Sequence, residues 1–310
     1  MTETTLAVAT ADHTLVGTLT TPSGPGPYPA ALLVPGSGPV DRDSDHRRMR
    51  LGITRELAQA LAAAGLATFR YDKRGVGEST GGDWRAAGFH DAAADVAAVL
   101  DALAARPEVD ASRLVLVGHS EGALLATRVA AARPGLAGVA LVSVSAQPGL
   151  DVLRWQSRNV AADLPPVVRG ILRLLRTDLE SKTEQNRQAI LATTTDVARV
   201  GGARLNARWH REFMAYDARV DLPRLTAPVL AVTGSKDLQV DPADLAVVAD
   251  LAGGPVETHV VPDVTHMLRR QDGAASLRAY KEEIRRPLDP RVTELLATWA
   301  RRVTGVRAVA

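Results

Sequence analysis

The chain contains no cysteine, which excludes disulfide bridges, thiolate metal sites and a cysteine nucleophile. Aromatic residues are scarce, at 4% of 310 residues. No apolar run approaches the roughly 18 uninterrupted residues of a membrane-spanning helix, so we expect none. Residues 1–13 carry acids and threonines instead of an apolar stretch, so they do not have the pattern of a signal peptide. We therefore expect a cytosolic protein.

A strong charge of either sign is also missing. Lysine and arginine together number 37 and aspartate and glutamate 35, which gives a formal net charge of +2 at pH 7. The basic residues are spread along the chain, whereas nucleic-acid-binding proteins gather them on one element, so we expect no nucleic-acid partner. The hydrophobic share of 46% is typical of a globular protein and excludes disorder.

Apolar runs alternate with helical patterns along both ends of the sequence. Residues 5–20 alternate apolar and polar side chains, which predicts an antiparallel hairpin around Asp12 and His13. The rest of the pattern predicts a mostly parallel sheet with helices on both faces, an α/β fold. Strands are predicted over residues 30–34, 66–71, 113–117, 139–144, 228–233 and 256–261, and helices over 53–64, 89–105, 122–132, 242–251 and 292–303.

The pattern changes between residues 147 and 224, where we expect helices and no strand. Such an insertion should lie over the carboxyl ends of the strands, where ligands bind in open α/β sheets. We therefore predict a core formed by residues 1–146 and 225–310 and a helical cap formed by residues 147–224. The helices expected in the cap cover residues 154–159, 167–179, 183–192 and 204–216.

The sharpest motif is Gly-His-Ser-Glu-Gly at residues 118–122, between a predicted strand and a predicted helix. The glycines of such a G-x-S-x-G motif allow a sharp turn that lifts the serine hydroxyl above the sheet. The helix that follows presents N–H groups and the positive end of its dipole to a developing negative charge. The motif therefore predicts that Ser120 is a nucleophile.

A serine nucleophile needs a base, and the base needs a group that orients it. In this structural context the chain order is serine, then acid, then histidine. Asp237 follows the strand predicted over 228–233, and His266 follows the strand predicted over 256–261, so both should lie at the same edge of the sheet. Asp241 is the alternative to Asp237 as the acid.

An oxyanion hole requires a pair of N–H donors. One is expected from Glu121, the residue after the nucleophile, and the other from the loop after the strand at residues 30–34. That loop reads Pro-Gly-Ser-Gly-Pro at residues 35–39, and its glycines let the backbone approach a substrate closely. The main-chain N–H of Ser37 is the candidate.

With these motifs the chain resembles the α/β-hydrolases over nearly its full length. Residues 118–122 match the nucleophile elbow of that family, and residues 70–79, Arg-Tyr-Asp-Lys-Arg-Gly-Val-Gly-Glu-Ser, match its D-x-R-G-x-G-x-S loop. Residues 36–43 resemble a bacterial esterase branch grouped with serine aminopeptidase-like hydrolases, which usually has histidine where this chain has Pro35. The resemblance implies hydrolysis of a small-molecule carboxylic ester or thioester through an acyl-enzyme, without a cofactor.

Several alternatives stay open. An aminopeptidase or a carbon–carbon bond hydrolase would use the same triad order, and a non-catalytic ligand receptor could keep the fold. An aminopeptidase would need acids in the cap to hold an ammonium group, and the candidates are Glu180, Glu184 and Glu212. The cap aromatics Trp155, Trp209, Phe213 and Tyr216 would line an acyl pocket or, at their helical spacing, belong to the core. A scaffold that forms a homodimer through its cap is a second non-enzymatic alternative, and such a dimer could coexist with activity.

A metal site is not expected. Asp41, Asp43 and Asp45 have the spacing that begins a calcium loop, but His46 and Gly52 stand where that loop needs glycine and glutamate.

Overall fold

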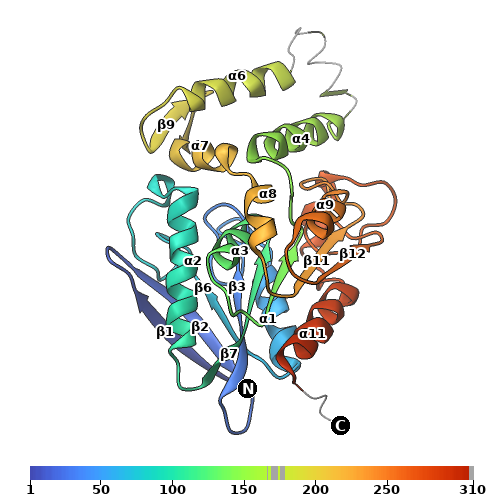
Figure 1. The fold of residues 1–310 in the computed structure, drawn as a ribbon. Coiled ribbons are helices and arrows are strands. Elements are labelled where there is room, and N and C mark those ends of the chain that lie inside the picture. Colours follow the sequence, from blue (N-terminus) through green and yellow to red (C-terminus); the bar gives the residue numbers. More distant parts are fainter. Residues whose placement is uncertain (166, 169–173, 175–178, 307–310) are drawn as a thin grey trace.

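The structure is a computed structural model, and it describes residues 1–165, 167–168, 174 and 179–306 (Figure 1). Its centre is an eight-stranded sheet in which six neighbouring strands run parallel, and the N-terminal hairpin adds two strands through antiparallel pairing. This confirms the predicted mostly parallel sheet. In spatial order the strands are β1 (Thr2–Ala9), β2 (Thr14–Thr21), β6 (Ala67–Tyr71), β3 (Tyr28–Val34), β7 (Val109–His119), β8 (Gly138–Val142), β11 (Val229–Gly234) and β12 (Val256–Val261).

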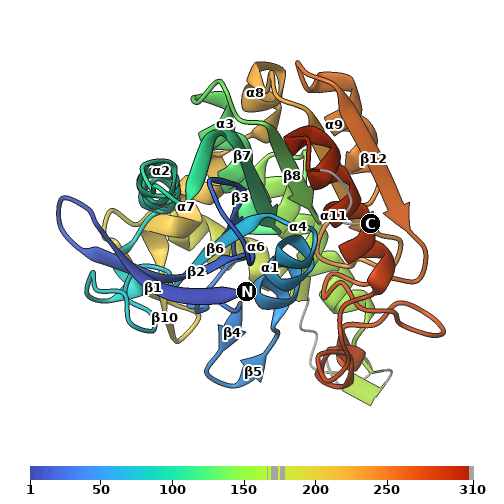
Figure 2. The same cartoon turned by 90° about the horizontal axis from the view of Figure 1, so that it is seen from below.

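Helices cover both faces of this sheet (Figures 1 and 2). Consecutive strand residues point to opposite faces, so Leu32 of β3 belongs to one hydrophobic core and Leu33 to the other. Burial on both faces explains why the central strands are continuous apolar runs without polar alternation. The helices of the first core are α2 (Phe89–Ala104), α3 (Glu121–Ala131) and α9 (Asp244–Leu251), and those of the second are α1 (Ile53–Ala63) and α11 (Pro290–Thr304).

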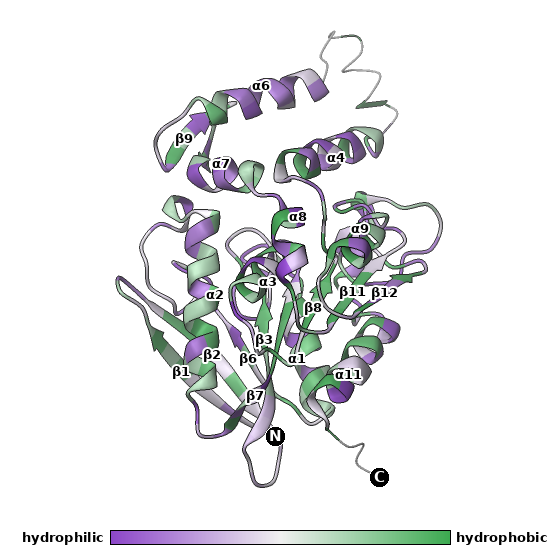
Figure 3. Cartoon of the chain, viewed as in Figure 1, coloured by the Kyte–Doolittle hydropathy of each residue, from purple (hydrophilic) through white to green (hydrophobic). Residues whose placement is uncertain are grey.

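The elements between β8 and β11 form a layer beyond the carboxyl ends of the strands, at the top of Figure 1. Figure 3 shows that α6, the outermost helix, is largely hydrophilic, in contrast to the central strands. Part of the helix predicted over 167–179 falls outside the described residues. The helices described in this layer are α4 (Gly149–Ala162), α6 (Leu179–Leu191) and α7 (Ala207–Ala215). The short helix α8 (Ala218–Asp221) lies below them and packs against α3 in the core.

The expectation that this insertion contains no strand was wrong. It includes the antiparallel hairpin β9 (Val197–Val200) and β10 (Ala203–Asn206). The turn between them is Gly201-Gly202, and both glycines have positive φ, at 60° and 84°. A Gly-Gly pair between two short strands is a hairpin signal, because such turns require positive φ. The helix predicted to begin at residue 204 therefore starts later, as α7.

The start of α7 is fixed by its cap. The side chain of Asn206 accepts a hydrogen bond from the main-chain N–H of Trp209 at 2.8 Å, which satisfies one of the donors that a helix leaves free at its first turn. This places Trp209 on the first turn of α7. Among the described helices, none combines the length and the apolar composition needed to cross a membrane.

Candidate active site

Ser120 occupies the sharp turn between β7 and α3. Its φ of 57° and ψ of −121° are sparsely populated by residues with a side chain and cost roughly 1–3 kcal/mol. The flanking glycines permit this turn because the backbone packs closely around it. A Cβ atom at Gly118 would lie 2.1 Å from the carbonyl oxygen of Gly122, and one at Gly122 would lie 2.2 Å from the carbonyl oxygen of Val34.

A continuous hydrogen-bonded chain joins Ser120, His266 and Asp237. The distance from Ser120 Oγ to His266 Nε2 is 2.9 Å, and that from His266 Nδ1 to Asp237 Oδ2 is 2.8 Å. A carboxylate only accepts, so Nδ1 carries the proton and Nε2 is left to accept from the serine hydroxyl. His266 and Asp237 are 2% and 3% exposed, and exclusion of water strengthens both hydrogen bonds.

The carboxylate of Asp237 is itself held in place. Its Oδ1 accepts hydrogen bonds from the main-chain N–H groups of Gln239 and Val240, at 2.8 and 3.0 Å. Asp241 does not meet His266. Its Oδ1 instead accepts from the main-chain N–H of Ala243 at 2.9 Å, as a turn residue does. Of the alternative acids, the structure brings Asp237 to the histidine.

The candidate oxyanion donors reach the same place as Ser120. Glu121 is the first residue of α3, and the N–H groups at the start of a helix have no acceptor within it. Ser37 and Ser120 line the same cavities. The loop that carries Ser37 approaches the nucleophile closely, since a Cβ atom at Gly36 would lie 3.4 Å from Cβ of Ser120.

His119, the residue before the nucleophile, is a buried contact that sequence reasoning did not assign. Its Nε2 lies 3.1 Å from the main-chain carbonyl oxygen of His266, and because a carbonyl only accepts, Nε2 donates. Burial, and next the neighbouring His266 ring, lower the pKa of His119 to about 3. The ring is therefore neutral near pH 7 and ties the loop of His266 to the turn of Ser120.

This lowered pKa predicts a loss of stability in acid. The pKa of His119 is about 3 when folded, against an ordinary value of 6.5, so folding favours the neutral ring. Its contribution to stability is complete above pH 6.5 and is lost as the pH falls toward 3, because only the unfolded chain binds the proton in that window. We expect His119→Gln, which keeps a donor for the His266 carbonyl, to remove about 1.4 kcal/mol per pH unit from the slope of the unfolding free energy.

Urea unfolding at several pH values between 4 and 7 measures this slope. The matched control is His90→Gln, at an exposed position, which should leave the slope unchanged. An acid slope that is the same in His119→Gln as in the parent would contradict the account.

Three cavities lie at or next to Ser120, which lines two of them. The first, of about 200 Å³, is lined by Ser120 and His266 together with mainly apolar side chains. The second, of about 330 Å³, begins at Ser37 and Glu121 and extends between α7 and the loop that follows β6. The third, of about 60 Å³, shares Ser120 with the first and Glu121 with the second. The apolar lining of the first is Val40, Met49, Leu51, Ile53, Met267 and Ile284, and that of the second includes Tyr71, Val76, Trp84, Leu205 and Trp209.

Some of the aromatic side chains of the insertion line the cavities, and others are buried in the core. Trp209 lines the second cavity, stacks on Phe213 with ring centroids 4.7 Å apart and donates from its indole N–H to Glu121. Phe213 lines the third cavity. Tyr216 is buried in the core and donates to Asp221 at 3.1 Å. Two of the four aromatics that were candidates for an acyl pocket therefore reach the cavities next to the nucleophile.

The acids at residues 41, 43 and 45 bond to main-chain groups of their own loop and to a neighbouring arginine. Asp41 Oδ1 accepts from the main-chain N–H groups of Asp43 and Asp45, at 3.0 and 2.9 Å, and Asp43 pairs with Arg70 at 2.7 Å. Over the part of the chain that the structure describes, no group of three or more His, Asp or Glu side chains is arranged to hold a metal ion.

The fold and the site agree with the family to which the sequence belongs. Residues 48–272 match the model of the serine aminopeptidase S33 family of hydrolases. The match covers most of the chain, which therefore belongs to this family. The sequence-based prediction of an α/β hydrolase is confirmed.

Relatives of known name and solved structures are also hydrolases or share their fold. The Esterase EstD of Thermotoga maritima is 26% identical over 296 residues, which cover 92% of this chain and 65% of that esterase. The human monoglyceride lipase is 27% identical over 229 residues, 70% of this chain and 71% of the lipase. The structure of Est1E from Butyrivibrio proteoclasticus with bound ferulic acid has a TM-score of 0.66 at 18% identity and covers 97% of this chain and 99% of its own, a likeness of fold.

Proposed function

We propose that the chain hydrolyses carboxylic esters through a triad of Ser120, His266 and Asp237 and an acyl-enzyme. The observation that carries the proposal is the hydrogen-bonded chain from the serine hydroxyl through the imidazole to the carboxylate, at 2.9 and 2.8 Å. The relatives named an esterase and a monoglyceride lipase support an ester bond as the target.

The proposed mechanism assigns one role to each group. As Ser120 Oγ attacks the acyl carbon, its proton passes to His266 Nε2, and Asp237 stabilises the charged imidazole. The N–H groups of Ser37 and Glu121 hold the oxyanion. His266 then gives the proton to the leaving oxygen, and the acyl-enzyme forms. Water attacks this ester with His266 as base and releases the acid.

The linings of the cavities support a placement for the alcohol and the acyl portion of the ester. The leaving oxygen takes its proton from His266, so the alcohol portion belongs in the 200 Å³ cavity that contains both Ser120 and His266. The acyl group then extends past Ser37 and Glu121 toward the 330 Å³ cavity. A lining that is mainly apolar favours burial of an uncharged acyl group.

Charges around these cavities argue for an ester over a peptide with a free amino group. The acids that line the larger cavity are already paired: Glu121 with Lys73 at 2.8 Å, and Asp95 with Arg74 at 2.8 Å. Among the described residues that line the three cavities, no carboxylate is left without a cationic partner to receive a substrate ammonium.

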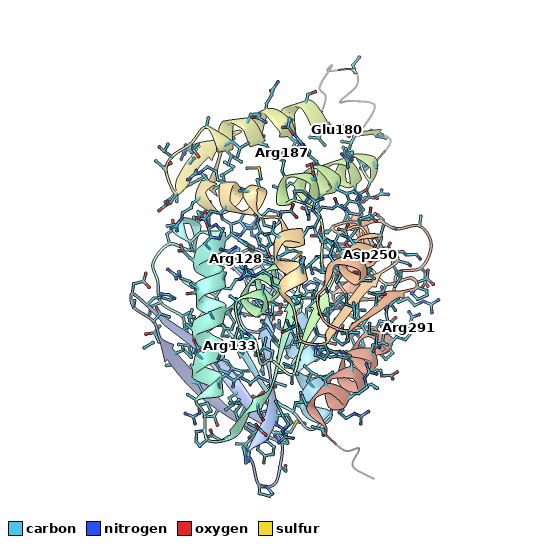
Figure 4. The ribbon with its side chains drawn as sticks, viewed as in Figure 1. Arg128, Arg133, Glu180, Arg187, Asp250 and Arg291 are labelled. Atoms are coloured by element: carbon cyan, nitrogen blue, oxygen red, sulfur yellow. The ribbon has the colours of Figure 1, made fainter. Side chains whose placement is uncertain are left out.

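Two of the cap acids considered for that role are engaged as well. Glu184 forms ion pairs with Arg154 and Arg187. Figure 4 labels Arg187 between α6 and α4. Hydrogen bonding, from Arg154 above all, lowers the pKa of Glu184 to about 2. Glu212 accepts from Arg208 at 2.8 Å.

The decisive experiment is labelling with a fluorophosphonate probe, followed by mass spectrometry of the modified peptide. We expect the label on Ser120, with labelling abolished in His266→Ala and retained in His90→Ala. Hydrolysis of p-nitrophenyl esters of increasing acyl length then measures how much of the acyl cavity is used. A folded protein that neither takes the label nor cleaves any of these esters would refute the triad and favour a ligand receptor.

We also propose that residues 147–224 form a cap distinct from a core of residues 1–146 and 225–310, because the insertion lies over the sheet edge and Trp209 reaches the elbow from it. Thioester cleavage, a cytosolic location and a homodimer formed through the cap remain predictions.

A further inference from the structure

We propose that Lys73 is a positioning residue that orients the main-chain N–H of Ser37 toward the oxyanion. This inference rests on the proposed function, because it concerns the oxyanion hole of the same reaction. No sequence motif assigned a role to Lys73 beyond its place within the D-x-R-G loop.

Lys73 connects the segments that carry the proposed oxyanion donors. Its Nζ donates to the carbonyl oxygen of Gly36 at 2.6 Å and to Glu121 Oε2 at 2.8 Å. The side chains are 15% exposed for Lys73 and 3% exposed for Glu121, so this is a largely buried ion pair. One ammonium group therefore ties the loop after β3 to the first residue of α3.

The bond to Gly36 has a consequence for Ser37 because both groups belong to one peptide unit. A trans peptide is planar, and its C=O and N–H point in opposite directions. The cis peptide recorded in the structure is Gly26–Pro27, so the unit between Gly36 and Ser37 is trans. Holding the carbonyl on Lys73 thus directs the N–H of Ser37 away from Lys73.

The cavity linings agree with that direction. Ser37 lines both cavities that contain Ser120, whereas Lys73 lines only the larger cavity, which Ser37 also borders and which does not contain Ser120. The carbonyl of Gly36 therefore points to an ammonium group on the side of the larger cavity, and the N–H of the same peptide points the other way. Glycines at positions 36 and 38 leave this loop free to rotate when nothing holds it. A rotated peptide would turn a carbonyl oxygen toward the oxyanion, and attraction would become repulsion.

The carboxylate of Glu121 keeps the lysine in place. It accepts from Lys73 on one oxygen and from the indole N–H of Trp209 in α7 on the other. Removing Lys73 alone would leave this buried carboxylate without its cation, which destabilises a protein by itself. A test must therefore separate the loss of peptide orientation from the cost of an unpaired charge.

The test compares Lys73→Met, Glu121→Met and the double variant Lys73→Met/Glu121→Met on a p-nitrophenyl ester. The double variant removes both charges and should be destabilised less than Lys73→Met, since a buried ion pair can be replaced by apolar side chains, although the indole N–H of Trp209 loses its acceptor on Glu121. We expect kcat to fall about 10²-fold in Lys73→Met and in the double variant, with KM little changed, because one oxyanion donor is lost. Glu121→Met keeps Lys73 and the main-chain N–H of residue 121 but removes the carboxylate that holds the lysine, so kcat should fall by less than in Lys73→Met.

A second readout reports on the oxyanion directly. A trifluoromethyl ketone forms a reversible tetrahedral adduct with an active serine, and its Ki should rise in Lys73→Met and the double variant by the factor lost in kcat. The matched control is Lys182→Met, at an exposed lysine of α6, which should leave both values unchanged.

The outcomes separate this inference from the proposed function. Wild-type kcat and Ki in the double variant would overturn the role of Lys73, since any defect of Lys73→Met would then belong to the unpaired carboxylate. Full activity in Ser120→Ala would instead overturn the triad itself.

Discussion

Replacing Ser120 with alanine is expected to lower kcat by roughly 10⁴ to 10⁶-fold without unfolding the protein. In the proposed mechanism the Ser120 hydroxyl oxygen attacks the acyl carbon, and His266 Nε2 lies 2.9 Å from it. The turn survives because alanine keeps the Cβ atom and hence the same backbone requirement at φ 57°. Steady-state kinetics on a p-nitrophenyl ester, together with the melting temperature, measure both halves of this prediction.

Ser143 supplies a matched control for this substitution. It follows β8, is buried and also has positive φ, at 51°, but its Oγ has no hydrogen-bond partner in the described structure. Ser143→Ala should therefore keep wild-type kcat. An equal loss of kcat in both variants would indicate that the substitutions damage the edge of the sheet and not that a nucleophile was removed. Retention of most activity in Ser120→Ala would reject Ser120 as the nucleophile.

The sequence predicts that Ser120, Asp237 and His266 lie close together, because each of them follows a predicted strand. The apolar runs before Ser120 and Asp237 identify buried parallel strands, and the strand before His266, Val256–Val261, is an edge strand with polar residues. The carboxyl ends of parallel strands meet at one edge of the sheet. The G-x-S-x-G motif is local, so its turn could be inferred without any long-range contact. Chain order then restricted the acid and the base to the last strands.

The contact between Lys73 and Gly36 could not be found in this way. These residues are 37 positions apart, and they meet only through the register of β3 and β6. That register pairs Leu33 with Arg70, so that Gly36 and Lys73 each lie three positions beyond the last pair. Register is set by packing across the whole sheet, which a pattern of apolar residues in one strand does not report.

The hairpin β9–β10 was missed for a different reason. Its strands are short and largely exposed or half-buried, so they lack the apolar alternation that marks a strand. The signal that remained was the turn, Gly201-Gly202. The helical patterns on either side led to a prediction of helices alone. The positive φ of the two glycines nevertheless allows the chain to reverse direction there.

The choice between Asp237 and Asp241 was likewise beyond the sequence, because both follow β11 within one loop. Hydrogen bonds to the backbone distinguish the two aspartates. The main-chain N–H of Asp237 bonds to the carbonyl of Gly234 at 3.1 Å, and its Oδ1 accepts from Gln239 and Val240. This turn directs the other carboxylate oxygen toward His266, while Asp241 caps the segment before α9.

Asp237→Asn should therefore lower kcat by about 10⁴-fold, whereas Asp241→Asn should leave it close to wild type. The amide of asparagine can still accept the N–H bonds of Gln239 and Val240, so the loop should keep its shape. It carries no negative charge to stabilise the imidazolium, however, and its NH₂ group would favour the tautomer of His266 in which Nε2 bears the proton and cannot accept from Ser120. Kinetics of the two variants on the same ester distinguish the acids: a large loss in Asp241→Asn with near-normal activity in Asp237→Asn would transfer the role to Asp241.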